Sequence, residues 1–254
     1  MGKNLALLEK NFLLDLDDQE IEIFTMDFIS DLFKHKYSNL QSIIYNLTNS
    51  GALIRLENKK YCKKTFVNDF ALGTFILKDS AIAYWSALNY WGITEQIPNT
   101  VFVQSLKLKK NKRIRGVYYR FVKISEKKFT GMIQIGRGDH KFRITDLEKT
   151  IIDCFDLPAY SGGYDELIRS FIKTKLNTTK LLNYSLKVDN LSIMKRISFL
   201  ADSFKLRGFE RYKKETKERL KDKYTLFSPL HERKGNFNSE WKLLINVDLK
   251  KLKD

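Results

Sequence analysis

The chain has 254 residues, of which 43% are hydrophobic and 30% are charged, and its formal net charge is +16. This length allows one large or two modest domains, and the excess of Lys and Arg favours polyanionic partners, chiefly nucleic acid and secondarily membrane surfaces. Two cysteines without a CxxC motif exclude a disulfide scaffold and a cysteine-rich zinc site, and the N-terminus lacks the apolar core of a signal peptide, so a cytoplasmic protein without a membrane partner is expected.

The first 66 residues have the pattern of a small helical module closed by a hairpin. A helix over 4–16 comes first, and a second helix over 24–33 is opened by Thr25, a good N-cap residue. After a short turn, Ser38 caps a third helix whose apolar residues recur at i, i+3, i+4 and i+7, and Gly51 stands where a helix ends. The apolar residues of this third helix are Leu40, Ile43, Ile44 and Leu47.

Two short strands with a polar tip follow, at residues 52–56 and 61–66. Two packed helices followed by a hairpin make a winged helix-turn-helix, in which the second helix of the pair enters the major groove of DNA and the hairpin, or wing, lies on the backbone. The sequence therefore predicts a DNA-binding domain over residues 1–68. A winged helix used only for protein contacts is the alternative.

The outward face of the third helix is polar, and Asn and Gln side chains carry the donor and acceptor pair that reads adenine. Charge is divided within the module, with about −6 over residues 1–31 and about +6 over residues 32–66, so its DNA face is basic although the whole is near neutral. The residues of this module predicted to contact DNA are Lys36, Ser38, Asn39, Gln41, Ser42, Tyr45, Asn46, Lys59 and Lys60.

The remainder, residues 69–254, is predicted to form a mixed α/β domain, so the chain as a whole falls in the α+β class. Residues 67–76 fit a linker, and a helix over 79–91 ends at Gly92. Thr145 and Glu148 have the spacing of a capping box before the next helix. Further strands are expected at 100–105, 117–124, 131–135, 141–144 and 241–247, and further helices at 150–155, 165–172, 178–186, 191–206 and 209–223.

The densest positive segment is 107–128, with a charge of about +9 and interleaved aromatic residues. One interpretation is a hairpin that clamps a polyanion, where each phosphate neutralised steepens the salt dependence of binding. The other is a solvated sheet edge whose lysines prevent pairing with other strands. Alternation over 117–124 puts Tyr119 and Phe121 on one face of a strand, with Tyr118 and Arg120 on the other. The residues assigned to DNA here are Lys109, Lys110, Lys112, Arg113 and Arg115.

Five segments beyond the N-terminal module carry a resemblance to a known family. They are SALNYWGITEQIP at 86–98, ITDLEKTIID at 144–153, MKRISFL at 194–200, LFSP at 226–229 and WKLLIN at 241–246. In their order and spacing, and together with the N-terminal module, they resemble the AbiEi antitoxins of the abortive-infection type IV toxin–antitoxin systems. The resemblance covers most of the chain.

The resemblance implies a transcriptional autorepressor and antitoxin of a phage-defence system. Its N-terminal domain is expected to bind inverted repeats in the promoter of its own operon. Its C-terminal domain is expected to join in DNA binding and to neutralise a cognate nucleotidyltransferase-like toxin, without the need for a stable complex. The family pattern supplies no catalytic residue, metal or cofactor, and the protein is expected to be a monomer that assembles cooperatively on its operator.

Two other function classes stay open. The acidic residues Asp146, Glu148, Asp153 and Asp156 fall in one short segment, which is typical of a metal-dependent nuclease, although no strand residue completes such a site. The other hypothesis is an interaction module that docks a toxin directly without specific DNA binding. Residues 136–139 are too short for a P-loop and predict a turn.

Overall fold

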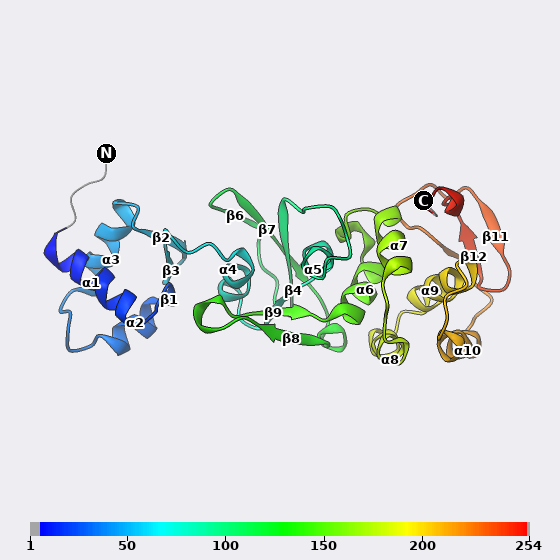
Figure 1. The fold of residues 1–254 in the computed structure, drawn as a ribbon, viewed down its shortest axis with the longest axis horizontal. Helices are drawn as coiled ribbons and strands as arrows, with labels where there is room; N and C mark the ends of the chain where they lie inside the picture. Colours follow the sequence, from blue (N-terminus) through cyan, green and yellow to red (C-terminus); the bar gives the residue numbers. More distant parts are fainter. Residues whose placement is uncertain (1–5, 253–254) are drawn as a thin grey trace.

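The computed structural model describes residues 6–252 as an elongated α+β structure (Figure 1). An N-terminal unit stands at one end, a six-stranded sheet occupies the middle, and helices with a small sheet form the other end (Figure 1). The α+β class predicted from the sequence is confirmed. Within the described range, none of the helices combines the length and the apolar character needed to cross a membrane.

Three helices and a three-stranded antiparallel sheet form the N-terminal unit. These elements are α1 (Leu7–Asp18), β1 (Ile23–Thr25), α2 (Met26–Leu32), α3 (Leu40–Asn49), β2 (Leu53–Glu57) and β3 (Lys60–Lys63). The strand order is β1–β3–β2, so β1, which sequence reasoning missed, pairs with the second strand of the hairpin. At the centre of the core, the ring of Phe12 meets those of Phe24, Phe33 and Tyr37 edge to face, with ring centroids 5.5–6.5 Å apart.

Local sequence explains where the two helices of the predicted helix-turn-helix begin and end. The Thr25 side chain caps α2, as predicted. Asn39 rather than Ser38 caps α3, because its carboxamide oxygen accepts the backbone N–H three residues further on. Gly51, at φ +79°, turns the chain so that the next backbone N–H reaches back to a carbonyl in the last turn of α3.

Six strands form the central sheet, with two helices packed against it. The elements are α4 (Asp69–Ile76), β4 (Ser80–Ile82), α5 (Tyr84–Tyr90), β5 (Thr100–Ser105), β6 (Lys112–Ile114), β7 (Val117–Lys123), β8 (Met132–Ile135) and β9 (Phe142–Thr145). The strand order is β6–β7–β5–β4–β9–β8, and the pairs β5–β7 and β4–β9 are parallel. Four of the predicted strands therefore exist, namely β5, β7, β8 and β9. In the sheet, β4 and β5 lie at the centre.

Two predictions in this region are wrong. Residues 67–76 are not a linker, because Asn68 caps a helix, α4, that packs on the central sheet. The helix predicted over 79–91 begins only at Tyr84. The segment Ser80–Ile82 is a strand instead, because its backbone hydrogen-bonds to β5 on one side and β9 on the other.

The hairpin of the N-terminal unit shares an apolar core with the central sheet. Leu56 and Cys62 of this hairpin are fully buried in the same cluster as Val103 and Tyr119. A second cluster holds most of the N-terminal helices together around Phe12. The hairpin therefore belongs to both parts, and the domain boundary after residue 68 stays a prediction.

Strand β7 contributes buried side chains to both faces of the sheet. Tyr119 and Phe121 are buried on one side, as their alternation predicted, while Val122 is buried on the other. The Tyr119 hydroxyl donates to Asp69, and burial raises the pKa of that phenol. Neither aromatic ring is open to a stacked base.

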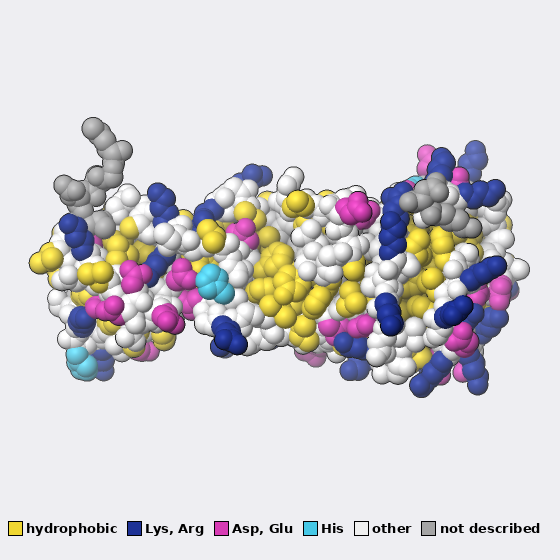
Figure 2. Space-filling view, in the orientation of Figure 1, with side chains coloured by type: hydrophobic (Ala, Val, Ile, Leu, Met, Phe, Trp, Pro, Cys, Tyr) yellow, Lys and Arg dark blue, Asp and Glu magenta, His cyan; other side chains and the backbone are white. Residues whose placement is uncertain are grey.

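The C-terminal part consists of five helices and a small sheet of order β10–β12–β11. These elements are α6 (Leu147–Asp156), α7 (Tyr164–Lys173), α8 (Thr178–Val188), α9 (Leu191–Ser203), α10 (Glu210–Glu218), β10 (Thr225–Leu226), β11 (Asn236–Asn238) and β12 (Leu243–Ile245). The predicted capping box does not form, since Asp146 rather than Thr145 caps α6, and Glu148 instead accepts the backbone N–H of Asn177. On the face in Figure 2, Lys and Arg side chains are concentrated at this end.

Candidate nucleic-acid interface

Helix α3 buries one face and leaves a polar face in solvent. Its apolar residues at helical spacing, among them Ile44 and Leu47, are buried against the other N-terminal helices. Gln41, Ser42 and Tyr45 lie on the exposed side, and Tyr45 keeps 66% of its surface accessible. This face is therefore accessible to a partner and is not used for packing within the described residues.

Some of the α3 residues predicted to contact DNA already make side-chain hydrogen bonds within the chain. The side chain of Asn39 is used as the helix cap, and the amide of Asn46 donates to the carboxylate of Glu9 on α1, 2.8 Å away. Within residues 6–252, the side chains of Ser38, Gln41, Ser42 and Tyr45 make no hydrogen bond to protein atoms. These four, with Gln41 as the best base reader by type, are the open donors and acceptors of the helix.

The turn between α2 and α3 is fastened to α1. Asp15 receives the ammonium of Lys36 at 2.5 Å and also the hydroxyl of Tyr37. The Lys36 ammonium and then the Tyr37 hydroxyl hold the pKa of the Asp15 carboxyl below its ordinary value of 3.8. Lys36 is exposed, so it remains at the surface beside α3, but its charge is balanced by Asp15.

The two lysines at the tip of the hairpin that were predicted to contact DNA have different surroundings. Lys59 is exposed and pairs with Asp27 at 2.9 Å. Lys60 instead turns into the protein, where its ammonium donates to the carbonyl oxygens of Phe75 and Ile76 at the end of α4. Lys60 therefore joins the hairpin to α4.

Three of the five basic residues assigned to DNA on the second hairpin face the N-terminal unit. Lys109 pairs with Glu57 at 2.6 Å. Lys112 donates to the backbone carbonyl of Leu56 in β2, and Arg115 donates to that of Phe66, just after β3. These three cations thus hold the two parts of the chain together, a role that the sequence alone did not suggest.

The other two residues of this hairpin point outward. Lys110 and Arg113 are exposed, and the only side-chain hydrogen bond of Arg113 within the described range goes to the carbonyl of Gly116 at 3.4 Å. Figure 1 shows β6, which carries Arg113, separated from α3 by the β2–β3 hairpin. The structure therefore brings the basic hairpin to the β2–β3 hairpin but not to α3.

A further contact between the two parts escaped sequence reasoning. Asp139, in the turn predicted at 136–139, accepts the backbone N–H groups of Glu22 and Ile23 at 2.6 and 3.0 Å. The neighbouring His140 lies 2.8 Å from the Glu22 carboxylate, and its ring packs on Phe66 with centroids 4.8 Å apart. The sequence of this segment predicted only a turn, and nothing in it indicated a contact with residues 22 and 23.

The four acidic residues of the nuclease alternative are each engaged by a lysine. The partners are Lys180 for Asp146 and Glu148, at 3.1 and 3.2 Å, Lys149 for Asp153, and Lys128 for Asp156 at 2.5 Å. Among residues 6–252, no three His, Cys, Asp or Glu side chains are grouped to hold a metal ion. In the described structure these carboxylates act as helix caps and ion-pair partners.

No family model matches the chain, and no curated protein matches it. The fold is similar to that of the RV2827C protein from Mycobacterium tuberculosis, known from a crystal structure. The two chains are 14% identical, and the match covers 95% of this chain and 92% of that one with a TM-score of 0.69. At this identity the likeness concerns the fold alone.

Proposed function

We propose that the chain is a DNA-binding autorepressor and antitoxin of the AbiEi type, and that its N-terminal unit is a winged helix. The observation that carries the DNA-binding part is the exposed polar face of α3, with Gln41, Ser42 and Tyr45 free of protein partners within residues 6–252. The outer side of an amphipathic helix is ordinarily polar, and on α3 it presents one amide and two hydroxyl groups. Amide and hydroxyl side chains suit base edges and phosphates.

The element order of the unit supports the winged-helix interpretation. Two helices joined by a tight turn are followed by the β2–β3 hairpin, and β1 completes a small sheet with it. In this arrangement α3 is the recognition helix and the hairpin is the wing. Lys59 at the exposed tip is the wing residue that meets a phosphate.

The contacts within the chain narrow the set of DNA-binding residues. Gln41, Ser42 and Tyr45 read the groove, and Ser38 contacts the backbone. Lys59, Lys110 and Arg113 supply positive charge from outside the helix. The engaged residues Asn39, Asn46, Lys60, Lys109, Lys112 and Arg115 keep the helix and the hairpin in position.

The repressor part is tested by the affinity of the full chain for duplex DNA from upstream of its own gene. Fluorescence anisotropy should give binding at least tenfold tighter than to a shuffled duplex, with an affinity that falls steeply with salt. Equal affinity for both duplexes at every salt concentration would contradict the repressor function.

The antitoxin part is supported by the order of the family-like segments from residue 86 to residue 246. The proposal predicts a nucleotidyltransferase-like gene next to that of this chain, and expression of that gene supplies the test. Induction of that gene should stop growth, and co-expression of the full chain should restore it. A Gln41→Ala chain should still restore growth while it no longer represses the promoter. Failure of the wild-type chain to restore growth would leave a repressor without an antitoxin role.

A further inference from the structure

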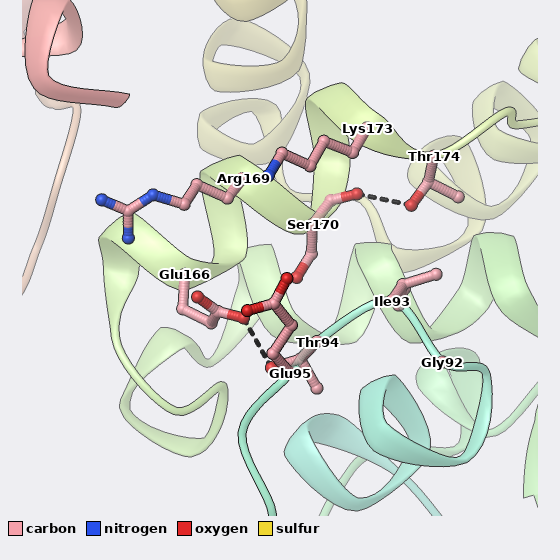
Figure 3. Close-up of a pocket in the computed structure, with 9 residues that line it drawn as sticks. All are labelled: Gly92, Ile93, Thr94, Glu95, Glu166, Arg169, Ser170, Lys173 and Thr174. Carbon is pink, nitrogen blue, oxygen red and sulfur yellow. Dashed lines mark hydrogen bonds between the residues drawn. The ribbon is translucent and has the colours of Figure 1, made fainter. Parts of the chain in front are cut away.

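A polar pocket of about 210 Å³ lies between the loop after α5 and one face of α7 (Figure 3). The loop contributes Thr94 and Glu95, and the helix contributes Glu166, Arg169, Ser170 and Lys173. The opposite face of α7 is apolar and buried in the core, which fixes the helix and the direction of its polar residues. The pocket lies in a different part of the chain from α3.

Ser170 has an unusual position in this pocket. Only 2% of its surface is exposed, and its hydroxyl has no hydrogen-bond partner within residues 6–252. Figure 3 shows the side chain directed toward Glu95 and into the pocket. A buried hydroxyl without a partner costs stability, and such groups are rare unless something else binds them.

The charged residues around Ser170 are also without ion-pair partners. Glu166 is held by the hydroxyl of Thr94 at 2.6 Å, which leaves the rest of its carboxylate free. Within the described part of the chain, none of Glu95, Glu166, Arg169 and Lys173 forms a salt bridge. Figure 3 shows the two carboxylates converging below Ser170, the Lys173 side chain lying back along α7, and the Arg169 guanidinium directed away from both carboxylates.

We propose that this pocket binds a small zwitterion of the α-amino acid class. The ligand's ammonium lies between Glu95 and Glu166 and donates to the Ser170 hydroxyl, and its carboxylate meets Lys173. Two carboxylates suit an ammonium better than a metal ion, since among residues 6–252 no third acidic or histidine ligand joins them. The volume lies below the roughly 300–1,000 Å³ of pockets for drug-sized ligands, which limits the ligand to a small molecule.

The test is calorimetric titration of the full chain with the twenty L-α-amino acids at millimolar concentration. Methylamine and acetate, which each keep one charge of glycine, serve as controls. At least one amino acid should bind, and the two single-charge controls should bind at least tenfold more weakly than that amino acid. Heat from none of the amino acids, or equal binding of a control, would overturn the proposal.

Variants of the chain separate a ligand site from a structural role. Ser170→Ala should weaken binding of the amino acid about tenfold, while the melting temperature of the unliganded protein stays equal or rises, because an unsatisfied hydroxyl is removed. Lys173→Ala should weaken binding, whereas Lys175→Ala, an exposed lysine just outside the pocket, should not. Unchanged affinity in the Ser170 variant would contradict the proposal. The result is independent of DNA binding by α3, so either proposal can fail alone.

Discussion

The ammonium of Lys60 donates a hydrogen bond to the carbonyl oxygen of Ile76, 2.5 Å away, and a second to that of Phe75. A lysine at the tip of the N-terminal hairpin thus closes the C-terminal end of α4, where a cation also meets the negative end of the helix dipole. Burial lowers the pKa of Lys60. The hairpin is therefore tied to the second part of the chain through the very residue that its sequence suggested for DNA.

Replacing Lys60 by alanine is expected to lower the free energy of unfolding by about 1–2 kcal/mol, because two carbonyl groups lose a charged donor. Lys59→Ala is the matched control. Its exposed pair with Asp27 contributes less than about 1 kcal/mol. Urea denaturation measures both. Lys59→Ala should instead weaken binding to all DNA sequences alike. Equal stability losses in the two variants would contradict the division of roles.

The basic hairpin gives a second pair of variants. Arg113 is exposed and points outward, so Arg113→Ala should reduce the slope of log K against log salt concentration by about 1. Arg115 donates to the Phe66 carbonyl, so Arg115→Ala should lower stability by about 1–2 kcal/mol and leave that slope unchanged. Salt titrations of DNA affinity and denaturation curves measure the two effects. The assignment fails if Arg115→Ala alone changes the slope.

How much of this arrangement the sequence reveals depends on the range of the forces involved. The caps and apolar spacing of α2 and α3 are local, and they predicted both helices to within a residue or two. Helix α4 was missed because Gly73 interrupts its pattern. That glycine serves tertiary packing, since a Cβ at its position would lie 3.1 Å from a methyl group of Val103. The sequence around Gly73 shows a residue that weakens a helix, but it does not show that Val103 leaves no room for a side chain there.

The same limit applies to the candidate interface. The exposed face of α3 follows from its periodicity, and Gln41 and Tyr45 were placed correctly on that face. The net charge of 107–128 does not show which of its cations are exposed to solvent. Lys112 and Arg115 donate to backbone carbonyls about fifty residues earlier in the sequence, and such long-range contacts leave no local pattern. The face of β7 on which Tyr119 lies was also predicted correctly. The sequence of the strand could not show that residues of other elements cover its ring.

Asp15 predicts a dependence of stability on acid. Because Lys36 and Tyr37 lower its folded pKa, its contribution is present above the unfolded value of 3.8 and is lost as the pH falls below it. Asp15→Asn should therefore reduce the free energy of unfolding at pH 7, by about 1–3 kcal/mol, and the difference from wild type should shrink below about pH 4. Denaturation curves at pH 7, 5 and 3 measure this. A difference that grows toward acid would contradict the pairing.

The buried pair of Lys149 and Asp153 predicts a double-mutant effect. Both residues lie in α6 with almost no exposed surface, and burial raises the pKa of Asp153 to about 6. Asp153→Leu alone should cost about 3–5 kcal/mol, since it leaves a buried ammonium without a partner. Combining it with Lys149→Met should recover most of that loss. If the double variant is less stable than the single one, the two charges do not act as a pair.

Sequence discrimination by variants of α3 tests most directly whether this helix reads DNA. The measured quantity is the ratio of affinities for the upstream DNA of its own gene and for a shuffled duplex, at one fixed salt concentration. Gln41→Ala and Tyr45→Ala should each lower that ratio, the first about tenfold or more, with unchanged melting temperatures. Asn49→Ala, an exposed change at the far end of the same helix, should leave it unchanged. A wild-type ratio near one, or a Gln41→Ala ratio equal to that of wild type, would contradict the claim that α3 reads DNA.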